Sequence, residues 1–342
     1  MTPVRFIEAL GLATPAPGDQ REQVAALFAG APLFQRHPTW IGPDGQRQIM
    51  GFLPDLRDLS DFPRRLATLL NRAYLDCRQD RLDRDGQPAA APLVVQLPEV
   101  LRQQAFADAF RDAAAQLDFT GVTKVHLLFG GAAAGLALLG QLQLDPAQPR
   151  AYVAAADSLV PPLMLDFLAA QGLLRDRHSP WNPIPAEAAA VLLLSSQGGF
   201  AQLRGWGATQ ETQCLADPDR ALLGRALCGA IDATLAMAGA SPDEVICDAG
   251  PERWRAEELG IVRSQRTFLV AERLPWHHIT QGSGDLGVAT GLVSVAAACH
   301  RPCASLILSG GRFGDRAAAL IDASGQPQMK GSLSEDDAVP GI

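Results

Sequence analysis

Short continuous runs of apolar residues recur along the chain, each bounded by glycine, proline or polar residues. Runs of this length and composition predict strands rather than helices. Because they are continuous rather than alternating, they are typical of a sheet buried between helix layers. The predicted strands cover residues 4–10, 47–52, 92–97, 124–129, 150–156, 188–195, 199–208, 244–248, 266–271, 304–308 and 317–322.

Longer segments separate most of these strands, with apolar residues three and four positions apart. That spacing predicts amphipathic helices. Residues 78–91, which mix charges with Gly and Pro, are predicted to form a surface loop. The predicted helices cover residues 20–29, 62–77, 99–117, 132–142, 160–174, 217–238, 251–259 and 285–299.

The order of strands and helices in the first half of the chain recurs in the second, which suggests a duplicated architecture. We therefore expect an α/β protein with an N-terminal half at residues 1–198 and a C-terminal half at residues 199–323. Residues 324–342 are polar, Gly- and Ser-rich and acidic. They are expected to form a disordered tail.

One predicted junction between a strand and a helix is built almost entirely from small residues. The predicted buried strand 124–129 leads through Gly130 and Gly131 into the apolar helix that starts at Ala132. A side chain at such a helix N-terminus lies near free backbone N–H groups and the positive end of the helix dipole, which favour a thiolate or an oxyanion. The junction therefore has the geometry of a nucleophile site but contains no nucleophile.

The bulk composition fits a compact α/β protein, since 47% of the 342 residues are hydrophobic and 19% are charged. A net charge of −8 at pH 7 argues against nucleic acid or an anionic membrane as the main partner. The N-terminus has no signal-peptide pattern, and no apolar run approaches the ~18–20 residues of a membrane span. We expect a cytoplasmic protein.

The cysteines lie in apolar segments, as expected for buried, reduced thiols. Cys299 and Cys303 flank a histidine with a spacing that superficially suggests a metal or redox pair, but no second pair completes a set of four ligands. Neither a metal nor a cofactor is expected. The six cysteines are Cys77, Cys214, Cys228, Cys247, Cys299 and Cys303.

Five motifs, in order, resemble those of the β-ketoacyl synthases of the thiolase superfamily over residues 4–322. Residues 6–15 resemble the opening G-x-V-T-P, 155–159 the G-G-A-D-S turn, 184–194 the G-E-G-A-A-x-L-V-L strand, 284–291 the G-H-x-x-x-A-x-G helix entry, and 313–318 the closing F-G-G-T-N-A loop. The resemblance implies a thiolase-like fold, with duplicated βαβαβ halves in a five-layered αβαβα arrangement, and a homodimer.

Three positions depart from the catalytic residues of that family. The nucleophilic cysteine falls on Ala132, the first histidine falls within residues 248–253 at about Gly250, and the second histidine falls on Asp285. A methyl group cannot form an acyl thioester, and an ionised carboxylate cannot donate the N–H that stabilises an oxyanion. The three losses together imply a protein without Claisen chemistry.

The same alignment defines a candidate pocket. His277 and His278 border it, but adjacent residues on an extended segment point in opposite directions, so both cannot share one metal; surface or edge histidines are the favoured interpretation. Phe313, in the family's gating loop, is either a core plug or a vestigial gate. The candidate pocket comprises Phe129, Gly131, Ala132, His277, His278, Asp285 and Phe313.

Residues 282–287 match the pattern G-x-G-x-x-G, which occurs in dinucleotide-binding sites. Such a site also needs a preceding strand and an acidic residue about 20 positions later. The segment before Gly282 is Trp276-His277-His278-Ile279-Thr280-Gln281, and Ser305 lies where the acidic residue would be. We expect a helix entry with close backbone packing instead.

Charged residues cluster where the family has its first catalytic loop. They are interpreted as a solvated helix face or, more specifically, as a partner-binding surface that replaces that loop. Glu187, which matches a structural glutamate of the family, is expected to be a buried carboxylate with structural hydrogen bonds. The candidate partner surface comprises Glu252, Arg253, Arg255, Glu257 and Glu258.

Two classes of function follow from these observations. In the first, the chain is a catalytically inactive scaffold: either an accessory protein or co-chaperone for an effector or its chaperone in type VI secretion, or a chain-length-factor-like partner of an active synthase subunit and its acyl carrier. In the second, it is an acyltransferase or thioester hydrolase that uses His277, His278 or Cys247 instead of the family's residues.

Overall fold

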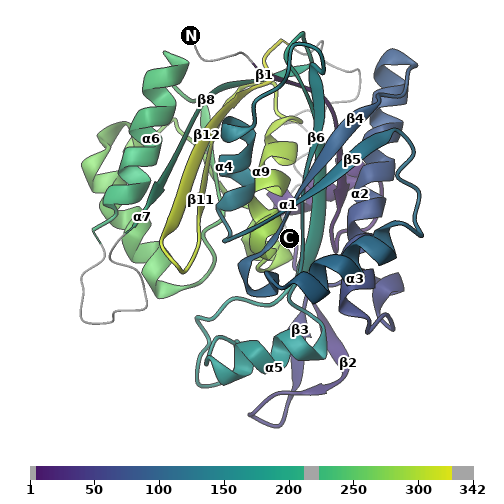
Figure 1. Cartoon of the computed structure of the whole chain (residues 1–342). Coiled ribbons are helices and arrows are strands. Elements are labelled where there is room, and N and C mark those ends of the chain that lie inside the picture. Colours follow the sequence, from purple (N-terminus) through teal and green to yellow (C-terminus); the bar gives the residue numbers. More distant parts are fainter. Residues whose placement is uncertain (1–4, 212–222, 326–342) are drawn as a thin grey trace, which may run out of the picture.

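The computed structural model describes residues 5–211 and 223–325, which form an α/β fold around one large sheet (Figure 1). Ten strands form this sheet in the order β10-β9-β11-β12-β8-β1-β7-β6-β4-β5, and β2 (Gln35–Ile41) and β3 (Arg47–Met50) form a separate hairpin. The ten strands are β1 (Arg5–Ala13), β4 (Ala91–Pro98), β5 (Val122–Gly130), β6 (Arg150–Ser158), β7 (Glu187–Ser195), β8 (Ala201–Gln210), β9 (Glu244–Cys247), β10 (Trp276–His278), β11 (Ala304–Gly310) and β12 (Asp315–Asp322).

The sheet consists of two half-sheets with the same topology. Counting strands along the chain within each half, β5-β4-β6-β7-β1 and β10-β9-β11-β12-β8 have the same order, third, second, fourth, fifth and first. In both, the first three strands of this order are parallel and the next is antiparallel to its neighbours. The repeated order of elements in the sequence therefore corresponds to a repeated topology.

Helices form layers outside and between the half-sheets (Figure 1). On one outer side, α2 (Phe62–Asp85) packs on β1, β6 and β7, with α3 (Gln104–Ala114) against it; on the other, α6 (Arg225–Ala238) packs on β8, β11 and β12, with α7 (Arg253–Gln265) beside it. Between them, α4 (Ala134–Gln141) and α9 (Thr290–Ala298) contact strands of both half-sheets. This is the five-layered α/β arrangement that the resemblance implies.

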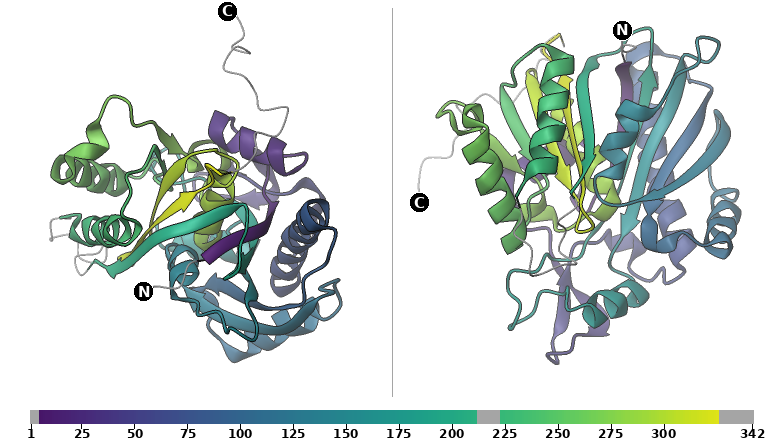
Figure 2. Two further views of the ribbon diagram at one scale, coloured as in Figure 1. Left: turned by 90° about the horizontal axis from the view of Figure 1, so that it is seen from above. Right: turned by 60° about the vertical axis from the view of Figure 1, so that its left-hand side comes forward.

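The two half-sheets meet at β1 and β8, which pair only over Arg5–Ile7. Figure 2 shows β1, in purple, beside β8 near the middle of the molecule. Further along β1, the N–H groups of Leu10 and Leu12 donate to the carboxylates of Asp80 and Asp76 on α2, at 3.0 and 2.8 Å. These side chains replace a neighbouring strand, so the buried N–H groups of β1 remain bonded beyond the seam.

Each outer helix packs closely on the first strand of its half-sheet because that strand carries glycine. A Cβ at Gly11 would overlap the Ala73 carbonyl oxygen and the Cys77 nitrogen of α2, and a Cβ at Gly207 would overlap the Ala230 carbonyl oxygen of α6. The contact requires a residue without a side chain in both halves.

Several elements differ from the sequence-based predictions. Helix α2 continues to Asp85, so the predicted loop 78–91 is wrong over most of its length; the positions Tyr74, Cys77 and Arg81 continue one buried stripe through it. Strand β5 is an edge strand with largely exposed side chains and not a buried one. Its apolar sequence misled the prediction, because edge position cannot be judged from one strand alone.

Other boundaries moved by a few residues or more. The predicted strand 266–271 is a 3-10 turn (Thr267–Val270), and the strand of this region is β10. The predicted helix 99–117 divides into a 3-10 turn (Glu99–Leu101) and α3, whereas α1 (Gln20–Ala29) matches its prediction. β2 was not predicted. The first residues of the predicted helix 217–238 and most of the predicted tail 324–342 lie outside the described residues.

A search of the described residues finds no helix that is both long and apolar enough to cross a membrane.

Replacing Gly11 by alanine tests the packing of α2 on β1. We expect Gly11→Ala to lower the free energy of unfolding by about 3 kcal/mol or more, because backbone atoms of α2 must move to admit the methyl group. Urea unfolding measures the change. Gly198→Ala is the matched control, since a Cβ at Gly198 meets no atom within 4 Å. Equal stability of the two variants would contradict the expected close packing.

Candidate functional site

The parallel strands of both half-sheets end at one cavity of about 750 Å³. Each strand end contributes a lining residue or the residue after it: Gly131 after β5, Asp157 in β6, Asp248 after β9, His278 in β10 and Gly310 in β11. Ligand sites in α/β proteins commonly lie at the carboxyl ends of parallel strands. The topology therefore places this cavity where chemistry is expected.

The strand–helix junction forms one wall of the cavity. Gly131 and Ala132 line it, and α4 begins after Ala133. The Ala133 N–H donates to Asp315 Oδ2 at 2.7 Å, and the Ser309 hydroxyl lies 3.5 Å from the Ala132 carbonyl oxygen and donates to Asp248 Oδ2 at 2.8 Å. Ser309 thus links the junction to the loop that starts at Asp248.

Apolar side chains form much of the remaining cavity wall. Phe313 lies at the cavity and is 66% exposed, so it is not a core plug. Apolar walls of this kind bury the greater part of a bound ligand. The apolar lining includes Phe34, Val100, Leu159, Met164, Phe167, Leu168, Leu173, Ile184 and Val288.

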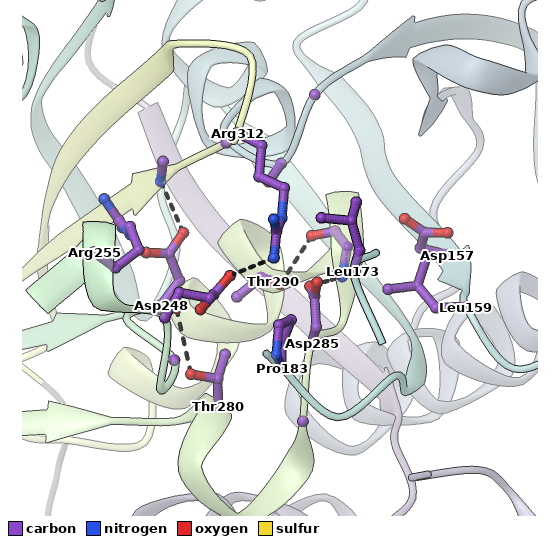
Figure 3. Close-up of a pocket in the computed structure, with 18 of the residues that line it drawn as sticks. Asp157, Leu159, Leu173, Pro183, Asp248, Arg255, Thr280, Asp285, Thr290 and Arg312 are labelled. Carbon is purple, nitrogen blue, oxygen red and sulfur yellow. Dashed lines mark hydrogen bonds and ion pairs between the residues drawn. The ribbon is translucent and has the colours of Figure 1, made fainter. Parts of the chain in front are cut away.

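Carboxyl groups dominate the polar wall. In the view of Figure 3, Asp285 lies between Asp248 and Asp157. Burial and, to a lesser extent, the negative charge of Asp285 raise the pKa of Asp157 to about 7, against the opposing effect of the Val288 and Ser158 N–H groups, which donate to its oxygens at 2.9 and 2.8 Å. Burial likewise raises the pKa of Asp285. These groups are held at the cavity in an environment that disfavours their ionised forms.

Glu252 belongs to the same polar wall. Burial and the nearby charge of Asp285 raise its pKa to about 7, against the opposing effect of Arg312, whose guanidinium donates to Glu252 Oε1 at 3.3 Å. Arg312 is partly exposed and also lines the cavity. A bound cation or a neutral group would suit this wall better than an anion.

The candidate partner surface divides into buried and exposed residues, so that prediction is corrected. Arg255 and Glu258 are 1% and 0% exposed, and Arg255 pairs with Asp248 and, at 2.6 Å, with Glu258. Arg316 pairs with Glu258 on its other oxygen at 2.6 Å. Buried charges need such partners. The burial of Arg255 and Glu258 was not predicted, because in the sequence their charges are typical of a solvated helix face.

Arg253 and Glu257 are the exposed members of that cluster, 86% and 51% exposed, and they pair with each other across one helix turn. Glu252 faces the cavity. Only Arg253 and Glu257 of the five therefore face solvent in this chain.

The two histidines lie in different surroundings. His278 lines the cavity, and its Nδ1 lies 3.2 Å from Cys247 Sγ. His277 Nε2 lies 3.2 Å from Glu244 Oε2, and His277 is not among the lining residues. Burial lowers the pKa of His278 and raises that of the fully buried Cys247 to about 12. The thiol of Cys247 is thus poorly suited to act as a nucleophile.

Glu187 is completely buried at the centre of a hydrogen-bonded group. Its two oxygens accept from Nε and Nη2 of Arg65 at 2.6 and 2.8 Å. Glu187 also accepts from the Leu53 N–H at 2.9 Å and from the Ser158 hydroxyl at 2.7 Å. These bonds tie α2 and the segment after β3 to the ends of β6 and β7. The geometry is that of a structural carboxylate.

The structure brings Gly131, Ala132, Gly250, His278, Asp285 and Phe313 to the one cavity. Phe129 instead packs with the apolar cluster beneath α2. Asp157, Asp315 and Arg312 also line the cavity but were not identified from the sequence. Asp157 lies at the carboxyl end of an apolar strand, and this signal could have identified it.

The G-x-G-x-x-G segment makes close backbone contacts. Gly284 has φ +84°, and a Cβ there would crowd the Ile184 carbonyl oxygen; the Asp285 N–H donates to that oxygen at 2.8 Å. Among the described residues, no group of His, Cys, Asp and Glu side chains could hold a metal ion. Five cysteines in the described part of the chain are free thiols, and Cys214 lies outside it.

No protein-family model matches the chain, and no curated protein matches it. Solved structures do. One matching chain comes from the structure of a type II polyketide synthase acyl-carrier protein in complex with its ketosynthase bound to the hexaketide. It matches with a TM-score of 0.76 and 15% identity, over 94% of this chain and all of that one. The chain has the thiolase-like ketosynthase fold.

Two further structures extend this likeness. The ishigamide ketosynthase/chain length factor matches with a TM-score of 0.65 and 18% identity, over 93% of this chain and 99% of that one. The oxazolomycin ketosynthase domain of Streptomyces albus JA3453 matches with a TM-score of 0.68 and 15% identity, over 93% and 75%. At these identities the likeness concerns the fold alone.

The raised pKa of Asp157 predicts a pH dependence of stability. Its folded-state pKa, about 7, lies above the ordinary value of 3.8. The folded state therefore holds the proton more tightly, and the stabilising contribution of Asp157 is present below pH ~4 and lost as pH rises to ~7. The free energy of unfolding should fall by up to ~1.4 kcal/mol per pH unit across that window from this group.

Urea unfolding of the parent and of Asp157→Asn at a series of pH values measures this contribution. Relative to the parent, the variant should gain stability as pH rises from ~4 to ~7, the window set by the two pKa values, whatever its absolute cost in lost hydrogen bonds. Asp44→Asn, at a partly exposed position in the turn between β2 and β3, controls for general charge effects. Parallel curves for the parent and Asp157→Asn would show that Asp157 is ionised throughout.

Proposed function

We propose that this protein is a ketosynthase-like subunit that carries out no Claisen condensation and acts by binding a protein partner. The proposal rests on the residues that line the cavity at the three positions matching the family's catalytic residues. Ala132 offers a methyl group, Gly250 offers no side chain, and Asp285 offers a carboxylate whose ionisation is disfavoured. Acyl transfer through an acyl-enzyme needs a nucleophile, and none of the three positions offers one.

The second class of function, an enzyme with other residues, has less support. Cys247 is fully buried and its pKa is raised to about 12 by burial, and His277 faces Glu244 rather than the cavity. Of these three residues His278 alone lines the cavity, and its Nδ1 lies 3.2 Å from that buried thiol. A general base without an accessible nucleophile could still activate water, so thioester loss is part of the test below.

The kind of partner is inferred from the structural neighbours. Their names describe an acyl-carrier protein in complex with a ketosynthase and a ketosynthase/chain length factor. We therefore favour a synthase subunit or its acyl carrier over the secretion effector or chaperone also expected from the sequence. The secretion role stays a prediction.

The edge strand β5 is a suitable interface for a homodimer. Strand β5 is nine residues long and has no neighbouring strand on its outer side among the described residues, and its Val125 and Leu128 are 38% and 40% exposed. An apolar edge strand of this length invites pairing with another chain. We infer that a second copy, or a related synthase subunit, pairs with β5.

The absence of acyl-transfer activity is the first prediction of this proposal. Incubation with malonyl and acyl thioesters should leave the intact mass of the protein unchanged and should not accelerate thioester hydrolysis, because the junction has no nucleophile. Ala132→Cys is the matched variant, since it restores a thiol at the junction. A stoichiometric adduct on the parent protein, or thioester loss abolished by His278→Ala, would refute the scaffold role.

The second prediction concerns the oligomer. The parent should have twice the mass of one chain in sedimentation equilibrium, and Leu128→Arg should shift it to the monomer, because a charge on β5 disfavours edge pairing. Ile41→Arg is the control, at an apolar side chain on the β2–β3 hairpin that is 60% exposed. A monomeric parent is incompatible with a homodimer, and a Leu128→Arg variant that still forms the dimer is incompatible with pairing through β5.

A further inference from the structure

A carboxylate from a distant strand occupies the N-terminus of α4. Asp315 begins β12, 182 residues after Ala133, and its Oδ2 accepts the Ala133 N–H at 2.7 Å. The carboxylate lies tightly between two turns, because a Cβ at Gly131 or at Gly311 would overlap it. Glycine at both positions leaves the space that this side chain fills.

The helix N-terminus, rather than a cation, partly offsets the charge of this carboxylate. No ion pair between described residues includes the Asp315 side chain. Arg316 donates to the Asp315 backbone oxygen at 2.9 Å, and its other bonds in the described part of the chain go to Glu258 and to the Gly311 carbonyl oxygen. Asp315 Oδ1 is buried without a hydrogen-bond partner in the described part of the chain. A helix N-terminus is equivalent to roughly half a positive charge. A full negative charge therefore leaves the junction net negative.

We propose that Asp315 is a built-in anion, which fills the anion-binding position of the strand–helix junction and keeps a thiolate or a substrate oxyanion out of it. The contact is autoinhibitory and is made within one chain. It deepens the proposed function and rests on it, because it adds a reason for inactivity beyond the missing nucleophile. A carboxylate beside a thiol raises the thiol pKa, which opposes the lowering by a helix N-terminus.

A cysteine placed at the junction reports on this contact. In Ala132→Cys, the thiol should titrate at or above its ordinary pKa of ~8.5. Adding Asp315→Asn preserves the shape of the side chain and removes its charge, so the titration midpoint should fall by about one pH unit or more. The measurement is the pH dependence of iodoacetamide alkylation at residue 132, followed by peptide mass spectrometry because the chain has other cysteines.

The double variant Ala132→Cys with Asp108→Asn is the control, since Asp108 is exposed on α3. An unchanged midpoint after Asp315→Asn, in a protein with the parent's circular dichroism, overturns the proposal. This experiment uses no thioester substrate, so its outcome is independent of the activity test for the proposed function.

Chemical rescue provides a second test without an introduced cysteine. Asp315→Ala should leave a space of carboxylate size at the N-terminus of α4. Formate should then raise the melting temperature of Asp315→Ala more than that of the parent, with chloride at equal ionic strength as the reference, because an anion that binds only the folded state stabilises it. The same response to formate in both proteins would show that no anion position exists there.

Discussion

The two half-sheets are joined by a seam of three residues in β1, and the layout of the molecule depends on it. Arg5–Ile7 pair with β8, and beyond them the N–H groups of β1 are bonded by Asp76 and Asp80 from α2 instead of by a strand. This substitution lets the half-sheets separate without leaving buried N–H groups unpaired. The space between them is filled by α4 and α9, which contact both.

Because each half-sheet repeats the same topology, the parallel strands of both halves end at the same cavity. The position of the site is thus a consequence of the duplication and needs no particular catalytic residue. Its chemistry is a separate matter, set by the residues after each strand. Here the polar part of the cavity wall consists largely of carboxyl groups. Arg255 pairs with Asp248 and Glu258, and Arg312 pairs with Glu252.

The sequence predicted the fold well because buried strands and amphipathic helices have distinct periodicities. It predicted that Ala132, Gly250 and Asp285 line one cavity because the order of motifs fixes which strand ends meet. It failed where tertiary context decides. The edge position of β5 depends on how the whole sheet is ordered, and the burial of Arg255 and Glu258 depends on Arg316, 58 residues after Glu258. In the sequence, a charged helix start looks the same whether it faces water or a buried arginine.

Asp315 illustrates the same limit at the site itself. From the sequence it is one residue in a loop that differs from a glycine-containing motif, and nothing nearby indicates its partner. In the fold, its carboxylate reaches across to Ala133 between Gly131 and Gly311. Those glycines matter here for the room they leave to a carboxylate, not for a left-handed backbone, since neither has positive φ. The junction therefore retains a helix N-terminus that favours an anion, and the chain supplies that anion from its own β12.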